Sequence, residues 1–426
     1  MNRSQLTRYF LRVRKVSEDI CAPLEVEDYV IQPIMDVSPP KWHLGHTSWF
    51  YEALFLDKLI PDYSAYHPDY AFVFNSYYES FGTRIQRDSR GTLSRPSVEE
   101  TMQFRAAITE QMCELIETID EAKWPEFRKH VILALNHEQQ HQELLLTDIK
   151  FIFATNPLRP AYLAAGSEPA VYRNPLPDQR YLNFPGGVYE IGYQGEGFYY
   201  DNECPVHKQY VHDFKLANRL VTNGEYRDFV EAGGYRDFRY WLSDGWETVK
   251  REGWQAPLYW EKIDGEWYEF TLRGLQKLDA EAPVCHVSYF EADAFAHWSG
   301  KRLPTEAEWE MAARAAGLQP EGGNFYDRKH FHPCPLDDDL RRKPEPLHQM
   351  LGDVWEWTRS AYLPYHGYRQ VEGPLGEYNG KFMINQMVLR GGSCATSADH
   401  TRITYRNFFQ TDKRWQFKGI RLAEDG

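Results

Sequence analysis

Apolar residues recur every three to four positions through the first third of the chain, a pattern typical of helices that bury one face. The pattern is clearest over residues 37–59, 97–119 and 125–154. A proline pair precedes the first long helix, and Ser97 with Glu100 forms a capping-box signal before the second. With an N-terminal helix, these segments predict a four-helix bundle over residues 1–155, whose core can hold a metal ion.

The pattern changes after Thr155. Residues 156–187 carry six prolines and no helical period, so we expect a Pro-rich linker over residues 156–182. Residues 183–426 contain many glycines and aromatic residues, short irregular strands and only two clear helical stretches, VTNGEYRDFVEAGG and YFEADAFAHWSGKRLPTEAEWEMAARAAG. The second part is therefore predicted to be an α+β domain.

Composition excludes several classes of protein. The net charge of −14 argues against a nucleic-acid or anionic-membrane partner. No run of about 18 apolar residues is present, and the N-terminal segment lacks the apolar core of a signal peptide. The six cysteines are widely scattered without a CxxC pair, which fits reduced thiols. We expect a soluble cytoplasmic protein.

The stretch NHEQQHQELLL carries the first candidate chemistry. His137 and His141 are four residues apart, so on a helix they share one face, as two metal ligands would. The same letters contain HExxH, in which Glu138 would be the general base of a metalloprotease. However, the downstream histidine of a metzincin is missing. Surface or core roles for both histidines are the alternative.

The stretch WHLGHTSWF offers a third ligand, because His43 and His46 are neighbours on one helical face. Either could face His137 and His141 across an antiparallel bundle, and either could instead make a hydrogen bond in the core. Three imidazoles with vacant positions suit a redox-active iron or a catalytic zinc.

These motifs, together with NSYYES and RDSRGTLSRPS, resemble the DinB-like iron-binding domain of the ergothioneine sulfoxide synthases, the hercynine oxygenase family. The second half is similar to the family's C-type-lectin-related, formylglycine-generating-enzyme-like domain, through PVCHVSYFEADAFAHWSGKRLPTEAEWEMAARAAG, LGDVWEWTRS and VLRGGSCATSADHTRITYRN. The resemblance covers nearly the whole chain. It implies a multidomain α and α+β protein: a DinB-like four-helix bundle followed by an α+β domain over residues 183–426.

The resemblance also implies a reaction. The family uses a non-haem Fe(II) and O2 to join the imidazole of hercynine (Nα-trimethylhistidine) to the sulfur of cysteine or γ-glutamylcysteine, leaving a sulfoxide. By analogy His46, His137 and His141 are the Fe(II) ligands, and His43 is not a ligand. Three histidines leave positions for both substrates and O2.

Further roles follow from the same resemblance. Gln140 is expected to contact hercynine. Tyr77 and Tyr78 correspond to a tyrosine pair of the apparently cysteine-using members, and we expect one or both to act in catalysis. Free cysteine should therefore be preferred over γ-glutamylcysteine.

The remaining candidates are substrate contacts. Arg87 and Arg90 fit recognition of the cysteine carboxylate, with a salt-bridged or solvated loop as the alternative. In the second domain, aromatic and amide groups suit a trimethylammonium ion and an arginine suits its carboxylate. The residues assigned to these roles are Asn407, Phe408, Phe409 and either Arg406 or Arg414.

Other readings remain open. Formylglycine generation needs two nearby cysteines, whereas the matching stretch contains only Cys394. The same fold could form a selenoxide, as in selenoneine synthesis, or act on plain histidine, as in ovothiol synthesis. A third reading is a non-enzymatic DinB-like metal-binding protein. The tryptophans of PTEAEWE and GDVWEW (Trp309, Trp355 and Trp357) are expected in the core.

Overall fold

The computed structural model describes residues 1–164, 174–342, 347–370 and 378–426. The chain divides into two compact units, Met1–Leu163 and Ala164–Gly426. Residues 165–173, which belong to the predicted linker, lie outside the described residues.

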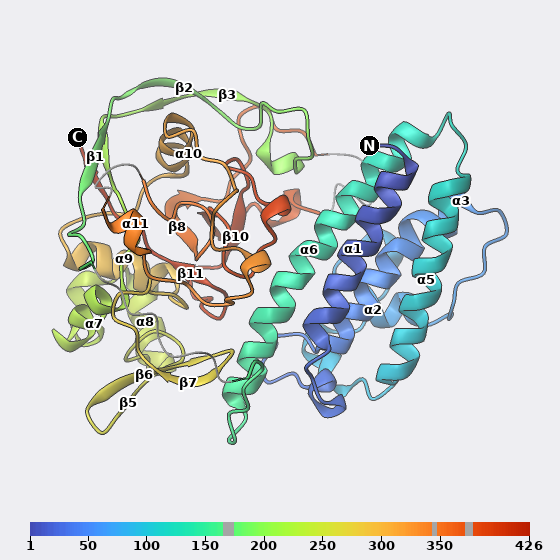
Figure 1. Cartoon of the computed structure of the whole chain (residues 1–426), viewed down its shortest axis with the longest axis horizontal. Helices are drawn as coiled ribbons and strands as arrows, with labels where there is room; N and C mark the ends of the chain where they lie inside the picture. Colours follow the sequence, from blue (N-terminus) through green and yellow to red (C-terminus); the bar gives the residue numbers. More distant parts are fainter. Residues whose placement is uncertain (165–173, 343–346, 371–377) are drawn as a thin grey trace. The chain divides into compact units, whose positions relative to one another are not determined.

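The first unit is mainly helical (Figure 1), and its four longest helices make the bundle. Both α1 and α2 pack against α5 and α6. Ser97 and Glu100 form the predicted capping box of α5, and Pro40 occupies the first turn of α2. The four-helix prediction is confirmed, with α1 at Arg3–Cys21, α2 at Pro40–Tyr51, α5 at Val98–Thr118 and α6 at Trp124–Thr155.

The helix α2 is buried on all sides rather than on one face, since each of its twelve residues is buried. Its polar side chains find partners inside the bundle: Lys41, for example, donates to the carbonyls of Leu93 and Pro96 at 2.7 Å. The helix continues into a π-helical turn and a short helix, and another short helix precedes the loop to α5. These elements are the π turn at Glu52–Leu56, α3 at Asp57–Leu59 and α4 at Tyr70–Phe74.

The second unit is built on short strands. A four-stranded sheet has the order β10-β9-β8-β11, and a three-stranded antiparallel sheet has the order β1-β4-β12. A two-stranded ribbon, β2-β3, and a three-stranded meander, β5-β6-β7, complete the strands of the described residues. Their bounds are β1 Tyr181–Phe184, β2 Gly187–Ile191, β3 His207–Val211, β4 Phe214–Ala217, β5 Trp260–Ile263, β6 Glu266–Thr271, β7 Gly274–Lys277, β8 Trp355–Ala361, β9 Met387–Arg390, β10 Asn407–Phe409, β11 Lys418–Gly419 and β12 Ala423–Asp425.

Helices of the second unit partly match the sequence prediction. The first predicted stretch contains α7, whereas the second is two helices, α9 and α10, separated by residues 299–305. The helix α8 was missed because its apolar positions are few, although Thr248 and Val249 are buried. The bounds are α7 Asn223–Glu231, α8 Ser243–Glu252, α9 Tyr289–Trp298, α10 Glu306–Ala315 and α11 Asp338–Arg341.

Trp309, Trp355 and Trp357 are all buried in the core of this unit, as predicted. The indole of Trp309 donates to Glu356 Oε2 at 2.8 Å, and Arg421 forms a buried ion pair with the same carboxylate. A buried carboxylate is tolerated here because it is fully paired. The α+β prediction is confirmed. Over the described ranges, no helix has the length and apolar character needed to cross a bilayer.

Candidate metal centre

Three imidazoles converge in the middle of the first unit. His46 comes from α2, and His137 and His141 come from successive turns of α6. One ring nitrogen of each lies within 4.8 Å of the others, and the Nε2 atoms of His46 and His137 are 3.3 Å apart. Adjacent nitrogen ligands on a metal with bonds of about 2.1 Å would lie about 3.0 Å apart. The rings therefore fit one metal ion held between two helices.

The orientation of His46 is fixed by its surroundings. Its Nδ1 lies 2.6 Å from the carbonyl oxygen of Phe74, which can only accept a hydrogen bond. The proton of this imidazole is thus on Nδ1, and the lone pair is on Nε2, which faces His137. The ring also stacks on Trp42, with centroids 4.7 Å apart and planes within 6°.

Burial keeps all three rings neutral. Desolvation and the neighbouring histidine lower the pKa of His46 and of His141 well below the ordinary value. Desolvation is also the main reason why the pKa of His137 falls to about 3. Because a metal ion binds the neutral imidazole, these shifts leave the ligand form in place at neutral pH. The donor set suits iron or zinc, and three histidines leave room for substrates.

His43 takes the hydrogen-bonding role rather than joining the cluster. Its Nδ1 lies 2.8 Å from Nδ1 of His141, and its Nε2 lies 3.0 Å from Oδ2 of Asp148. The same oxygen of Asp148 accepts the backbone N–H of Ser38 at 2.9 Å. Asp148 was missed in the sequence, although it follows His141 by seven residues, two turns along the same face of α6.

Glu138 cannot serve as the general base of a metalloprotease. Its Oε1 accepts hydrogen bonds from Arg105 at 2.6 Å and from Ser17 at 2.7 Å, and Arg14 contacts its other oxygen. Burial alone would raise the pKa of Glu138, but Arg105 and Arg14 together lower it to about 2. The carboxylate is a fully engaged structural anion, so the HExxH interpretation is wrong.

Phe50 separates the predicted tyrosine pair from His137. The hydroxyls of Tyr77 and Tyr78 are 3.4 Å apart, and their rings stack at 4.5 Å. The ring of Tyr78 contacts Phe50 at 5.7 Å, and Phe50 in turn contacts His137 at 4.1 Å. The backbone of Tyr78 is held by the side-chain amide of Asn75. Tyr78 is therefore held in place beside Phe50, with Tyr77 stacked on it.

Of the two predicted arginines, only Arg90 is buried near the centre. Its guanidinium lies 3.4 Å above the indole of Trp42, which also stacks on His46. One nitrogen donates to Ser38 Oγ at 2.9 Å, while Nε is buried without a hydrogen-bond acceptor among the described residues. Burial, together with Arg87, lowers the pKa of Arg90 well below its usual value. Arg87 is exposed and donates to the carbonyl of Asp36.

Gln140 is half-buried on α6, one turn after His137. The helix therefore presents Gln140 close to the face that carries both histidines.

Asn407, Phe408 and Phe409 form β10, the edge strand that pairs with β9, whereas Arg414 lies five residues further along the chain. Phe408 stacks on Tyr362 at 4.0 Å, and Phe409 lies under the ammonium of Lys418. Arg414 donates to Glu291 at 2.8 Å. Arg406 is buried in an ion pair with Glu306. The substrate roles of Asn407, Phe408, Phe409 and Arg414 stay predictions.

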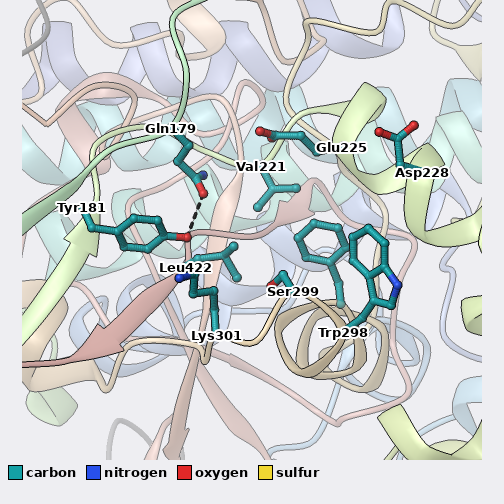
Figure 2. A pocket seen from close by; sticks show the side chains of 10 residues that line it. Gln179, Tyr181, Val221, Glu225, Asp228, Trp298, Ser299, Lys301 and Leu422 are labelled. Atoms are coloured by element: carbon teal, nitrogen blue, oxygen red, sulfur yellow. Dashed lines mark hydrogen bonds between the residues drawn. The ribbon is translucent and has the colours of Figure 1, made fainter.

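The second unit also contains a small cavity of about 190 Å³ (Figure 2). Its volume is below the usual range of about 300–1,000 Å³ for ligand sites. Tyr181 donates to Gln179 across its rim. None of the residues predicted to have a role lines this cavity: its lining is Gln179, Tyr181, Val221, Glu225, Asp228, Phe295, Trp298, Ser299, Lys301 and Leu422. The histidine cluster remains the better candidate site.

Neutral, buried imidazoles on two helices of a bundle, followed by an α+β unit, define a two-domain protein with a candidate metal centre. Residues 9–145 match the DinB superfamily, and residues 169–426 match the sulfatase-modifying factor enzyme 1-like domain. The chain is 31% identical to the hercynine oxygenase of Mycolicibacterium smegmatis, over 92% of both chains. It is 34% identical to the hercynine oxygenase of Mycobacterium tuberculosis, over 69% of this chain and 71% of that protein.

The second unit has other relatives. The formylglycine-generating enzyme of Streptomyces coelicolor is 30% identical over 62% of this chain and 94% of that protein. The chain belongs to the hercynine oxygenase family. It is an oxygenase.

Proposed function

We propose that this protein is a non-haem Fe(II), O2-dependent sulfoxide synthase of ergothioneine biosynthesis, which joins hercynine to cysteine. The observation that carries the proposal is the convergence of three neutral imidazoles from α2 and α6 in a chain whose relatives are hercynine oxygenases. The reaction balances as ring C–H plus cysteine S–H plus O2, giving the C–S bond, one S=O group and one water. All four electrons that reduce O2 come from the two substrates.

Iron, when bound by His46, His137 and His141, supplies O2 activation and a position for the cysteine sulfur. The surrounding residues would orient the reactants. Arg90 is the better carboxylate partner of the two arginines, because it is buried and keeps an unsatisfied N–H. Gln140 would contact hercynine from the same face of α6.

Tyr77 and Tyr78 would provide the proton needed as oxygen is reduced. Their hydroxyls are close enough for one phenol to support the other, and Tyr78 is buried one ring from His137. The substrate roles of Asn407, Phe408, Phe409 and Arg414 belong to the same proposal.

The proposal is tested by anaerobic Fe(II) titration followed by mass spectrometry of products. We expect one iron per chain, loss of that iron in His137→Ala, and a hercynine–cysteine sulfoxide when O2 is admitted. The variant His130→Ala, which changes a histidine of α6 outside the cluster, should still bind iron. Failure of the wild type to bind stoichiometric iron would refute the proposal.

The same assay decides among sulfur and selenium donors. We expect free cysteine to give more product than γ-glutamylcysteine, since the Tyr77–Tyr78 pair resembles that of the cysteine-using members. A preference for γ-glutamylcysteine or a selenosugar as donor would contradict this substrate assignment. A preference for plain histidine over hercynine as acceptor would contradict it as well, and each result would favour one of the related reactions.

A further inference from the structure

A chain of hydrogen bonds leads from the histidine cluster to a buried carboxylate. It runs from His141 to His43 and from His43 to Asp148, with distances of 2.8 and 3.0 Å. All three residues are buried, and the outer end is held by the backbone N–H of Ser38. The hydrogen bonds thus run from His141 on α6 to His43 on α2 and back to Asp148 on α6.

The carboxylate of Asp148 determines which group donates in each of these hydrogen bonds. Oδ2 of Asp148 accepts the backbone N–H of Ser38 and, as a carboxylate oxygen, accepts from His43 as well, so the ring nitrogen that faces it carries a proton. His43 is then protonated at Nε2. In a neutral ring its Nδ1 is consequently an acceptor, and the short contact to His141 requires the proton of His141 to lie on Nδ1.

We propose that His43 and Asp148 are positioning residues that hold His141 in the tautomer protonated at Nδ1, so that Nε2 presents its lone pair to the metal. His46 is held in the same tautomer by a backbone carbonyl, whereas His141 depends on two side chains. Such outer partners fix the ring of a ligand and strengthen its basicity, and their loss commonly weakens metal binding by about 10- to 100-fold.

The alternative arrangement makes the opposite prediction. If His43 carried protons on both nitrogens, it would donate to His141 as well as to Asp148. His141 would then hold its own proton on Nε2 and could not use that nitrogen as a ligand. The two arrangements therefore differ in an observable property of the metal-free protein.

The first test is nitrogen NMR of the full-length, metal-free protein labelled with ¹⁵N-histidine at neutral pH, with His141→Gln used to assign the signal. We expect the pattern of a neutral ring protonated at Nδ1 for His141 and at Nε2 for His43. A His141 ring protonated at Nε2, or a doubly protonated His43, would overturn the proposal.

The second test measures affinity for Co(II), whose visible absorption reports histidine coordination. His43→Phe removes the acceptor of His141 and should weaken Co(II) binding about 10- to 100-fold. Asp148→Asn keeps an oxygen that can accept from His43, so it should retain affinity within a few-fold. His130→Phe is the matched control on α6 and should not change affinity.

Folding is checked separately by near-ultraviolet circular dichroism of each variant. If His43→Phe is folded and binds Co(II) as tightly as wild type, the proposal is wrong. If that variant does not fold, the NMR result on the wild type decides. The inference rests on the proposed metal centre, but the two are tested separately: the tautomer is read from the metal-free protein by NMR, whereas iron binding and product formation are measured on the wild type with Fe(II).

Discussion

At the scale of single residues, the two acidic residues near the centre, Glu138 and Asp148, have different roles. Glu138 follows a candidate ligand directly in the sequence, yet its carboxylate ties α1 to α5 through Arg14 and Arg105. Asp148 is farther away in sequence, yet it reaches the centre through His43. Sequence adjacency is therefore a poor guide to which carboxylate contacts the histidine cluster, because neighbouring residues on a helix point about 100° apart.

Replacing Glu138 by Gln should destabilise the protein strongly, because the buried guanidinium groups of Arg14 and Arg105 would lose their counter-charge. Breaking a buried pair of this kind costs about 3–5 kcal/mol. The free energy of unfolding from urea titration measures the effect. The exposed Glu114→Gln on α5 is the control and should change stability by less than about 0.5 kcal/mol. Equal stability of both variants would contradict the structural role.

Removing the phenol of Tyr78 should affect the reaction rather than the fold. Tyr78→Phe is expected to lower sulfoxide formation by about 100-fold, the lower end of the usual contribution of a general acid. Part of the turnover should shift to simple oxidation of the thiol. Product ratios by mass spectrometry test this expectation. The exposed Tyr210→Phe serves as the control, and unchanged ratios in both Tyr77→Phe and Tyr78→Phe would show that neither phenol takes part.

At the scale of elements, α2 is the helix on which the centre depends. Its glycine, Gly45, lies against Phe74 of α4 so closely that an added Cβ would come within 2.0 Å of the ring. The carbonyl of Phe74 is also the group that orients His46. Close packing at one glycine thus holds the residue that fixes a ligand.

Gly45→Ala should therefore weaken metal binding as well as stability, with a cost of about 1–3 kcal/mol from overpacking. Co(II) titration and urea unfolding measure the two effects. A matched test is the double variant Gly45→Ala with Phe74→Leu, in which the smaller side chain makes room for the new methyl group. Metal affinity that recovers in the double variant would support the argument. An unchanged single variant would refute it.

The sequence predicted the helices of the first unit well, because periodic apolar positions and the Ser97 capping box are local signals. Helical spacing also placed His137 and His141 on one face, whereas the choice of His46 over His43 as the third ligand came from the resemblance to the family. What the sequence did not show depends on packing between distant segments. The contact of His43 with Asp148, the burial of Arg90 beside Trp42 and the helix α8 all require the assembled structure.

At the scale of the whole molecule, buried ionisable groups are not confined to the unit that carries the histidine cluster. The second unit buries Asp353, whose Oδ1 accepts from the backbone of Cys334 at 2.8 Å and from Asn324 at 2.7 Å. Burial raises the pKa of Asp353 from its ordinary value to about 6. The native state therefore holds a proton on this group over a pH range in which the unfolded chain has released it.

The contribution of Asp353 to the free energy of unfolding should consequently fall as the pH rises from about 4 to about 6, and then level off. A shift of this size corresponds to about 2–3 kcal/mol. Asp353→Asn cannot ionise, so the difference in unfolding free energy between wild type and variant should change by this amount between pH 4 and pH 7. Urea titrations at several pH values measure it. The exposed Asp264→Asn is the control, and a pH-independent difference for Asp353→Asn would contradict the prediction.

The crossing of the hydrogen-bond chain between α2 and α6 has a practical consequence. His141 and Asp148 belong to α6, while His43, which bridges them, and the candidate ligand His46 belong to α2. A slip of one helix along the other by a single turn, about 5.4 Å, would break every one of these contacts at once. The absorption spectrum of a bound cobalt ion would therefore detect a register shift between α2 and α6, even where the protein has not yet unfolded globally.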